Sequence, residues 1–262
     1  MMPFFEVAGT GPDLLLLHGW ASSRRLWRHV APTLITTFRC WSIDLPGFGH
    51  APDLGPRAGD VRAYSDWLRD FCDAQGIERC GVVGHSMGGA LTLQFAADQP
   101  ERVRAFSAIN PVVTGRVILR ALEHLPQRAR WMGWSHEFSQ TVLGPMLARP
   151  ELDGLRDVIW PLQRRIEDFN VACGTTLLDT WDLLTDFDVR PQLGAVTAPG
   201  LIVLGSLDIN VPNSEGLSAA AALSNVRVAR FTAGHTITDT YPRAVADLLF
   251  GFFARALLGE GV

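Results

Sequence analysis

Short runs of apolar residues alternate along the chain with longer segments in which apolar residues recur at helical spacing. The runs have the length and composition of buried strands and lie at 14–17, 38–43, 80–83, 103–109, 201–204 and 226–231. The longer segments predict helices at 24–34, 62–75, 87–98, 214–223 and 243–258. Strands that alternate with helices form parallel sheets. We therefore predict an α/β fold with a mostly parallel sheet and helices on both faces, and residues 3–7 add a short edge strand.

The alternation stops between Pro111 and Thr197, where the pattern is helical throughout. The helices predicted there lie at 117–125, 127–134, 138–147, 153–166 and 173–184. An insertion of this kind is expected above the carboxyl ends of the strands, where open α/β sheets bind ligands. The chain is accordingly divided into a core domain, residues 1–110 and 189–262, and a helical lid, residues 111–188.

Composition narrows the function classes. A length of 262 residues with 47% hydrophobic and 19% charged residues fits one large globular domain. The net charge of −4 and the lack of an aromatic-basic module argue against nucleic-acid binding. The four cysteines, Cys40, Cys72, Cys80 and Cys173, have no metal-binding spacing and are expected to be free thiols. Neither a signal peptide nor an apolar run of membrane-spanning length is recognised, so a cytoplasmic protein without membrane contact is expected.

The most informative stretch joins the predicted strand 80–83 to the predicted helix 87–98. Between them lies Gly84-His85-Ser86-Met87-Gly88, a match to G-x-S-x-G. A strand that turns directly into a helix forces Ser86 into a strained backbone conformation, and a Cβ at position 84 or 88 would collide with the turn. The pattern alone is weak, but its strand-turn-helix context predicts an exposed, nucleophilic serine.

A serine hydroxyl is a poor nucleophile near neutral pH and needs a base, which in turn needs an orienting acid. His235 follows the predicted strand 226–231, and Asp208 follows the predicted strand 201–204. The order Ser86, Asp208, His235 is the order of the triad in α/β-hydrolases. Capping of a turn by Asp208, or a plain loop position for His235, is the structural alternative.

Other polar residues near these strand ends receive structural roles. His85 is expected to pack, because consecutive side chains on a sharp turn diverge. Asp44 and Asp53 are assigned to salt bridges or turns. Asn110 ends another strand where an acid could stand, and its uncharged amide favours Asp208 as the triad acid.

An oxyanion hole requires two N–H donors. The residue after the nucleophile, Met87, supplies one, and the turn after Leu17 supplies the other, which we assign to Trp20. Nothing in this constellation requires a metal, a nucleotide or a redox cofactor.

These motifs together resemble the α/β-hydrolase superfamily over nearly the whole chain. The resemblance rests on His18-Gly19-Trp20, the segment 44–49, the serine turn, the Asp208 turn and Gly234-His235. It implies serine-hydrolase chemistry without specifying a substrate. The serine also argues against the haloalkane dehalogenases and epoxide hydrolases, which attack with a carboxylate.

Three segments, LLLLHGWASSRRLW, IDLPGFGHA and LGSLDINVP, are moreover similar to the pimeloyl-acyl-carrier-protein methyl ester esterases. That resemblance implies a lid whose arginines receive an acidic carrier protein. The residues assigned to this contact are Arg116, Arg120, Arg128, Arg130 and Arg156, and Arg149, Arg164 and Arg165 belong to the same basic part of the lid. Solvation of amphipathic helices is the alternative role for these arginines. Acidic residues from Glu167 to Asp188 follow without a compensating base, and His85 stands where that family usually has an aromatic residue.

The lid is also rich in aromatic and Met residues, which imply an apolar acyl pocket suited to a medium-length chain. Trp131, Trp134 and Phe138 of the lid and His18 of the core are assigned to this pocket. We therefore predict a carboxylic-ester hydrolase that acts on a small-molecule or carrier-linked ester. The alternatives are carbon–carbon or thioester hydrolysis, a cofactor-free perhydrolase, or a ligand receptor on the same scaffold.

Overall fold

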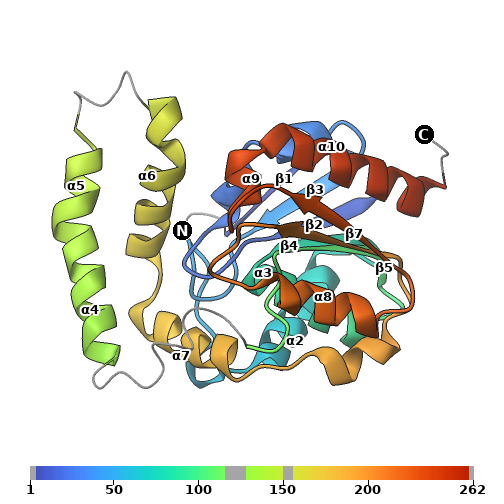
Figure 1. Cartoon of the computed structure of the whole chain (residues 1–262), viewed down its shortest axis with the longest axis horizontal. Coiled ribbons are helices and arrows are strands. Elements are labelled where there is room, and N and C mark those ends of the chain that lie inside the picture. The colour runs from blue at the N-terminus through green and yellow to red at the C-terminus, as the bar shows by residue number, and fades with distance from the viewer. Residues whose placement is uncertain (1–3, 116–127, 150–155, 260–262) are drawn as a thin grey trace.

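The computed structural model describes residues 4–115, 128–149 and 156–259. A seven-stranded sheet in the order β1-β3-β2-β4-β5-β6-β7 forms its centre (Figure 1). The strands are β1 (Phe5–Ala8), β2 (Asp13–Leu17), β3 (Arg39–Ile43), β4 (Cys80–His85), β5 (Val103–Ile109), β6 (Gly200–Gly205) and β7 (Val226–Phe231). All neighbouring strands are parallel except β1, which pairs antiparallel with β3 at one edge. The α/β fold with a mostly parallel sheet and an edge strand near the N-terminus is confirmed.

Helices cover both faces of the sheet. The main ones are α1 (Ala31–Leu34), α2 (Val61–Gln75), α3 (Met87–Asp98), α8 (Asn213–Ala222), α9 (Ile237–Thr240) and α10 (Pro242–Phe253), which a π turn, η7 (Ala254–Leu258), extends. Figure 1 shows α10 on one face and α2, α3 and α8 on the other. The continuous apolar run of β2 follows from this double cover, since Leu14 and Leu16 join the cluster under α10 while Leu15 and Leu17 join the cluster under α3.

The region predicted as a lid is helical in its described part. It comprises α4 (Arg128–Phe138), the π turn η4 (Ser139–Leu143), α5 (Gly144–Leu147), α6 (Arg156–Val171) and α7 (Gly174–Thr185). Figure 1 shows two upright rods beside the sheet, one formed by α4 and α5 and the other by α6, with α7 leading back to the sheet. Among the described residues no strand lies between β5 and β6. The boundaries of core and lid stay a prediction.

Several predicted elements differ from the observed ones. The helix predicted at 24–34 is two short pieces, η1 (Arg24–Trp27) and α1. Pro32 lies in the first turn of α1 and has no N–H with which to continue an earlier helix. The helices predicted at 127–134 and 138–147 are one continuous rod, and α6 runs past Ile166 to Val171 despite Pro161. Three short helices were not predicted, because no periodic pattern marks them in the sequence: η2 (Gly55–Arg57), η6 (Arg190–Ala195) and α9. The helix predicted at 117–125 lies outside the described residues.

Candidate active site

Ser86 occupies a strained turn between β4 and α3. Its φ of 55° and ψ of −114° are rare for a residue with a side chain, and its N–H donates to the carbonyl oxygen of Ile109 at 2.9 Å. The turn is closed tightly, because a Cβ on Gly84 would lie 1.9 Å from the carbonyl oxygen of Gly88 and one on Gly88 would lie 2.4 Å from that of His18. The two glycines thus permit the conformation that presents Ser86 at the carboxyl edge of the sheet.

Asp208 and His235 meet after β6 and β7. His235 Nδ1 lies 2.7 Å from Asp208 Oδ2, and Asp208 Oδ1 accepts the N–H groups of Asn210 and Val211 at 2.8 and 3.0 Å. Burial alone would raise the pKa of Asp208, but the hydrogen bond and charge of His235, together with the two N–H donors, lower it below its ordinary value. The carboxylate is therefore held charged against Nδ1, which leaves Nε2 as the nitrogen available to a substrate or nucleophile.

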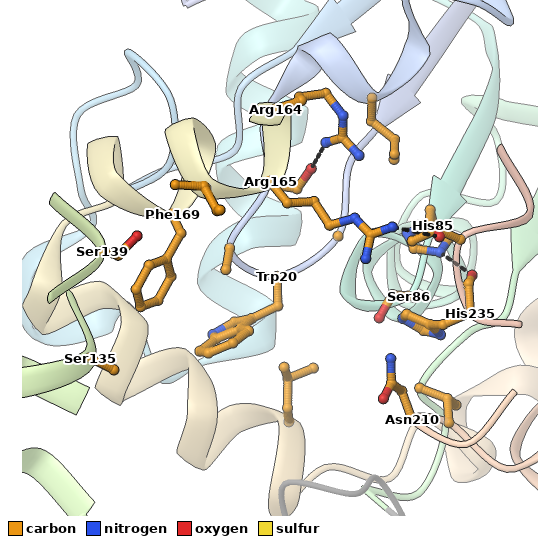
Figure 2. Close-up of a pocket in the computed structure, with 18 of the residues that line it drawn as sticks. Trp20, His85, Ser86, Ser135, Ser139, Arg164, Arg165, Phe169, Asn210 and His235 are labelled. Atoms are coloured by element: carbon orange, nitrogen blue, oxygen red, sulfur yellow. Dashed lines mark hydrogen bonds between the residues drawn. The ribbon is translucent and has the colours of Figure 1, made fainter. Parts of the chain in front are cut away.

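Ser86 and His235 line the same cavity, and Figure 2 shows their side chains beside each other. Within the described residues the Ser86 hydroxyl makes no hydrogen bond. Catalytic hydrogen bonds of this kind commonly tighten only in the complex with substrate.

Two residues to which sequence reasoning gave other roles hold the backbone of His235. The carbonyl oxygen of His235 lies 2.8 Å from Asn110 Nδ2 and 2.9 Å from His85 Nε2. Asn110 Oδ1 in turn accepts the N–H of Gly205 at 2.8 Å and so joins the ends of β5 and β6 to the histidine loop. The His85 ring packs, as expected, but against the ring of His235 at a centroid separation of 4.8 Å, and it lines the cavity. The position of His85 directly before Ser86 in the motif was the feature of the sequence that could have placed it at the site.

His85 gives the fold a pH dependence. Burial lowers the pKa of His85 to about 3, with a further contribution from His235, so His85 is neutral in the folded protein while the unfolded chain takes up a proton below about pH 6.5. Stability therefore falls as the pH drops from 6.5 towards 3, by up to about 1.4 kcal/mol per pH unit from this group. Thermal unfolding of the wild type and of His85→Phe, measured from pH 7.5 to 4.5, should show a shallower fall for the variant. Parallel curves would contradict this.

The turn that follows β2 passes directly over the nucleophile. A Cβ on Gly19 would lie 3.0 Å from His85 Nδ1 and 3.2 Å from Ser86 Cβ, a tight contact that glycine avoids. The next residue, Trp20, is fixed through its indole N–H, which donates to Thr180 Oγ1 of α7 at 3.0 Å. Among the described residues the backbone N–H groups of Trp20 and Met87 have no acceptor. Trp20 lines the same cavity as Ser86, and Met87 follows Ser86 directly in the chain; their roles in an oxyanion hole stay a prediction.

His18 does not lie where the sequence analysis placed it. Its side chain is fully buried and is absent from the cavity lining. Its Nε2 accepts the N–H of Leu45 at 2.9 Å, and its Nδ1 lies 2.7 Å from the carbonyl oxygen of Gly19. Burial lowers the pKa of His18, in keeping with this neutral role. Both ring nitrogens are therefore occupied by backbone groups, and His18 connects the turn after β2 to the segment at Leu45.

The cavity has a volume of about 630 Å³ and lies between the strand ends and helices α4 and α6. Its predominantly apolar wall comes from both parts of the chain and includes Leu26, Val112, Trp134, Phe138, Leu143, Ile166, Phe169, Leu184 and Val211. Trp134 and Phe138, which the sequence assigned to the pocket, are among these residues. The backbone of Trp131 lies on α4, and its side chain is outside the described part. This size and a mostly apolar lining are typical of a site for a small molecule.

The arginines of the lid divide into different groups. Arg116 and Arg120 lie outside the described residues, and Arg128, Arg130 and Arg156 lie on α4 and α6 with side chains that are not described. Arg164, which the sequence grouped with the basic surface, is instead 1% exposed. It donates to Asp168 Oδ2 of α6, to Asp239 Oδ2 of α9 and to Ser22 Oγ, each at 2.9 Å.

The expectation that the acidic residues after the basic part of the lid lack compensating bases is wrong for Glu167, Asp168 and Asp188, the last of which pairs with Arg190 at 2.6 Å. Arg25 Nη1 lies 2.8 Å from Glu167 Oε2 and 3.5 Å from Asp168 Oδ1, and Asp168 also pairs with Arg164. The sequence could not show this because Arg25 belongs to η1, far from α6 along the chain. This network connects α6 to the turn beside Ser86.

The family comparison agrees with this geometry. Residues 12–240 match the model of the α/β hydrolase fold family, and the chain belongs to that family. It is 30% identical to a pimeloyl-[acyl-carrier protein] methyl ester esterase of Aeromonas hydrophila, over 80% of this chain and 82% of that one. A protein of the same name from Pectobacterium carotovorum is 27% identical over 95% and 97% of the two chains.

Solved structures show the same fold. An enol-lactonase from Burkholderia xenovorans superposes with a TM-score of 0.77 at 20% identity, covering 98% of this chain and 96% of that one. An esterase from Thermogutta terrifontis gives 0.77 at 21% identity, covering 96% and 93%. Together with the esterase relatives, the family identifies the chain as a carboxylic ester hydrolase, the class predicted from the sequence.

The described residues contain no group of three His, Cys, Asp or Glu side chains that could hold a metal ion. None of their helices is long and apolar enough to cross a membrane.

Proposed function

We propose that the protein is a serine carboxylesterase in which Ser86, His235 and Asp208 act as a triad. The observation that carries this is the Asp208–His235 hydrogen bond of 2.7 Å at a cavity that Ser86 also lines. The supporting feature is the strained serine turn, since backbone strain of this kind has a cost in conformational energy and occurs mostly at functional sites. The proposal also assigns the backbone N–H groups of Trp20 and Met87 to the oxyanion hole.

In the proposed mechanism, His235 Nε2 takes the proton of Ser86 as Oγ attacks the ester carbonyl carbon. The N–H groups of Trp20 and Met87 bind the oxyanion of the tetrahedral intermediate, and losing one such donor typically costs about 100- to 1000-fold in kcat. The C–O bond to the alcohol then breaks, and His235 returns the proton to the leaving alkoxide. Water, deprotonated by His235, attacks the acyl-enzyme, and release of the acid restores Ser86. Asp208 stabilises the imidazolium in both halves.

The finer proposal is that the substrate is the methyl ester of a pimeloyl group on an acyl carrier protein, in biotin synthesis. The names of the relatives support it, as do the apolar cavity and the sequence positions of Arg128, Arg130 and Arg156 on α4 and α6. An acidic carrier would be drawn to a basic surface around the mouth of such a cavity.

The test compares a methyl ester linked to the carrier protein with a free methyl ester of the same acyl chain. We expect kcat/KM for the carrier-linked ester to be higher and to fall as salt increases, because the attraction is electrostatic. Charge reversal at Arg128 and Arg130 should lower kcat/KM for the carrier-linked ester by about tenfold or more and leave the free ester unchanged. Arg227→Glu, on exposed β7, is the matched control. An equal loss on both esters would show that these arginines only solvate the lid.

A further inference from the structure

The cavity has a charge asymmetry that the esterase chemistry does not use. Apart from two histidines, the charged side chains that line it are Arg164 and Arg165 of α6, and no carboxylate belongs to its described lining. The two neighbouring arginines differ in how far carboxylates neutralise them. That difference indicates which charge on a substrate the cavity favours.

The charge of Arg164 is compensated within the fold through both of its Nη groups, and its Nε has no partner among the described residues. Its side chain is 1% exposed and lies between the carboxylates of Asp168 and Asp239, each 2.9 Å away. A buried guanidinium with two carboxylate partners is compensated within the protein and offers no free charge to a ligand.

Arg165 is only weakly compensated. Its side chain is 51% exposed, and its Nη2 donates to Thr236 Oγ1 at 3.2 Å. Its nearest carboxylate among the described residues is Asp239 at 3.9 Å, which Arg164 binds more closely. Figure 2 shows the Arg165 side chain extending from α6 towards His85 and His235. Its guanidinium therefore borders the cavity close to the catalytic base.

We propose that Arg165 is a specificity-determining residue that selects esters carrying an anionic group, a carboxylate or a phosphate-like group, on an otherwise apolar chain. The apolar wall formed by Phe169, Leu184 and their neighbours holds the chain, and the Arg165 guanidinium pairs with the anion. This inference rests on the proposed esterase function and adds a substrate class to it. Because the Arg165 side chain is half exposed, water screens the pair, and we expect a preference of about threefold to tenfold.

The experiment measures acid release from monomethyl esters of glutaric, adipic and pimelic acid, and from methyl pentanoate, hexanoate and heptanoate. Each pair has the same acyl length and differs in one terminal carboxylate, and methyl 6-phosphonohexanoate replaces that carboxylate by a phosphonate. In the wild type, kcat/KM should favour the anionic member of at least one pair. Arg165→Gln should remove the preference, mainly through KM, while the neutral ester changes less than twofold. Arg165→Lys should retain part of the preference, and Arg165→Glu should reverse it.

Arg227→Gln removes the same charge from exposed β7 and serves as the control. Equal loss on charged and neutral esters in Arg165→Gln, or the same loss in Arg227→Gln, would overturn the inference. A response to the phosphonate alone would assign the site to phosphate-like groups, and a response to the carboxylates alone would assign it to dicarboxylic half-esters. If the wild type hydrolyses neutral esters without any charge preference, only this inference fails. If it hydrolyses no ester at all, the proposed function fails.

Discussion

Replacing Ser86 by alanine is expected to lower kcat for a simple ester by about 10⁶-fold, and replacing His235 by alanine to lower it nearly as far. The double variant Ser86→Ala/His235→Ala should be no slower than either single variant. The reason is that the base has nothing to activate once the hydroxyl is gone, so the two side chains act as one unit. Initial rates with p-nitrophenyl butyrate, compared over the four proteins, measure this.

Ser139→Ala is the matched control for that series. Ser139 is a buried serine on η4 that lines the same cavity, so its replacement removes a hydroxyl without touching the triad. Its activity should stay within a few-fold of the wild type. Wild-type turnover by Ser86→Ala would refute the nucleophile assignment, and a double variant markedly slower than both single variants would refute the coupling.

The sheet and the positions around Ser86 could be predicted because local sequence determines them. Continuous apolar runs such as 14–17 are read correctly as strands buried on both faces, and the glycines at 84 and 88 are required by a turn only a few residues long. The strand ends at Asp208 and His235 follow from parallel topology, which brings carboxyl ends to one edge.

The other features of the site could not be predicted, because they depend on contacts between residues far apart in the chain. His18 looked like a pocket residue from its place in the His18-Gly19-Trp20 motif, but its two ring nitrogens are taken by backbone groups at Gly19 and Leu45. From the sequence, Arg164 resembled the other surface arginines of the lid. Asp239, whose carboxylate neutralises it, lies on the short helix α9, which no sequence pattern predicts. Such pairings follow only from the way α6 packs against the core.

Asp208→Asn is expected to lower kcat by about 10⁴-fold with little change in KM. The substitution is selective because the amide oxygen of the introduced side chain can still accept the N–H groups of Asn210 and Val211, so the turn after β6 keeps its hydrogen bonds. What is lost is the negative charge at Asp208 Oδ2, 2.7 Å from His235 Nδ1, which fixes the tautomer and stabilises the imidazolium. Steady-state kinetics of the variant measure the effect, with Asp188→Asn, an exposed carboxylate after α7, as the control.

A pH series separates this catalytic loss from damage to the fold. Burial alone would raise the pKa of Asp208, but its hydrogen bonds, above all the one to His235, lower it below the ordinary 3.8. A depressed carboxyl pKa stabilises the folded state above pH 3.8, and this contribution is lost as the pH falls through the folded-state value. The wild type should therefore be more stable than Asp208→Asn near neutral pH, and the gap between their unfolding midpoints should close in acid. A gap that persists unchanged in acid, below the folded-state pKa of Asp208, would mean that the variant acts by distorting the turn, and the lost turnover could not then be assigned to the missing charge.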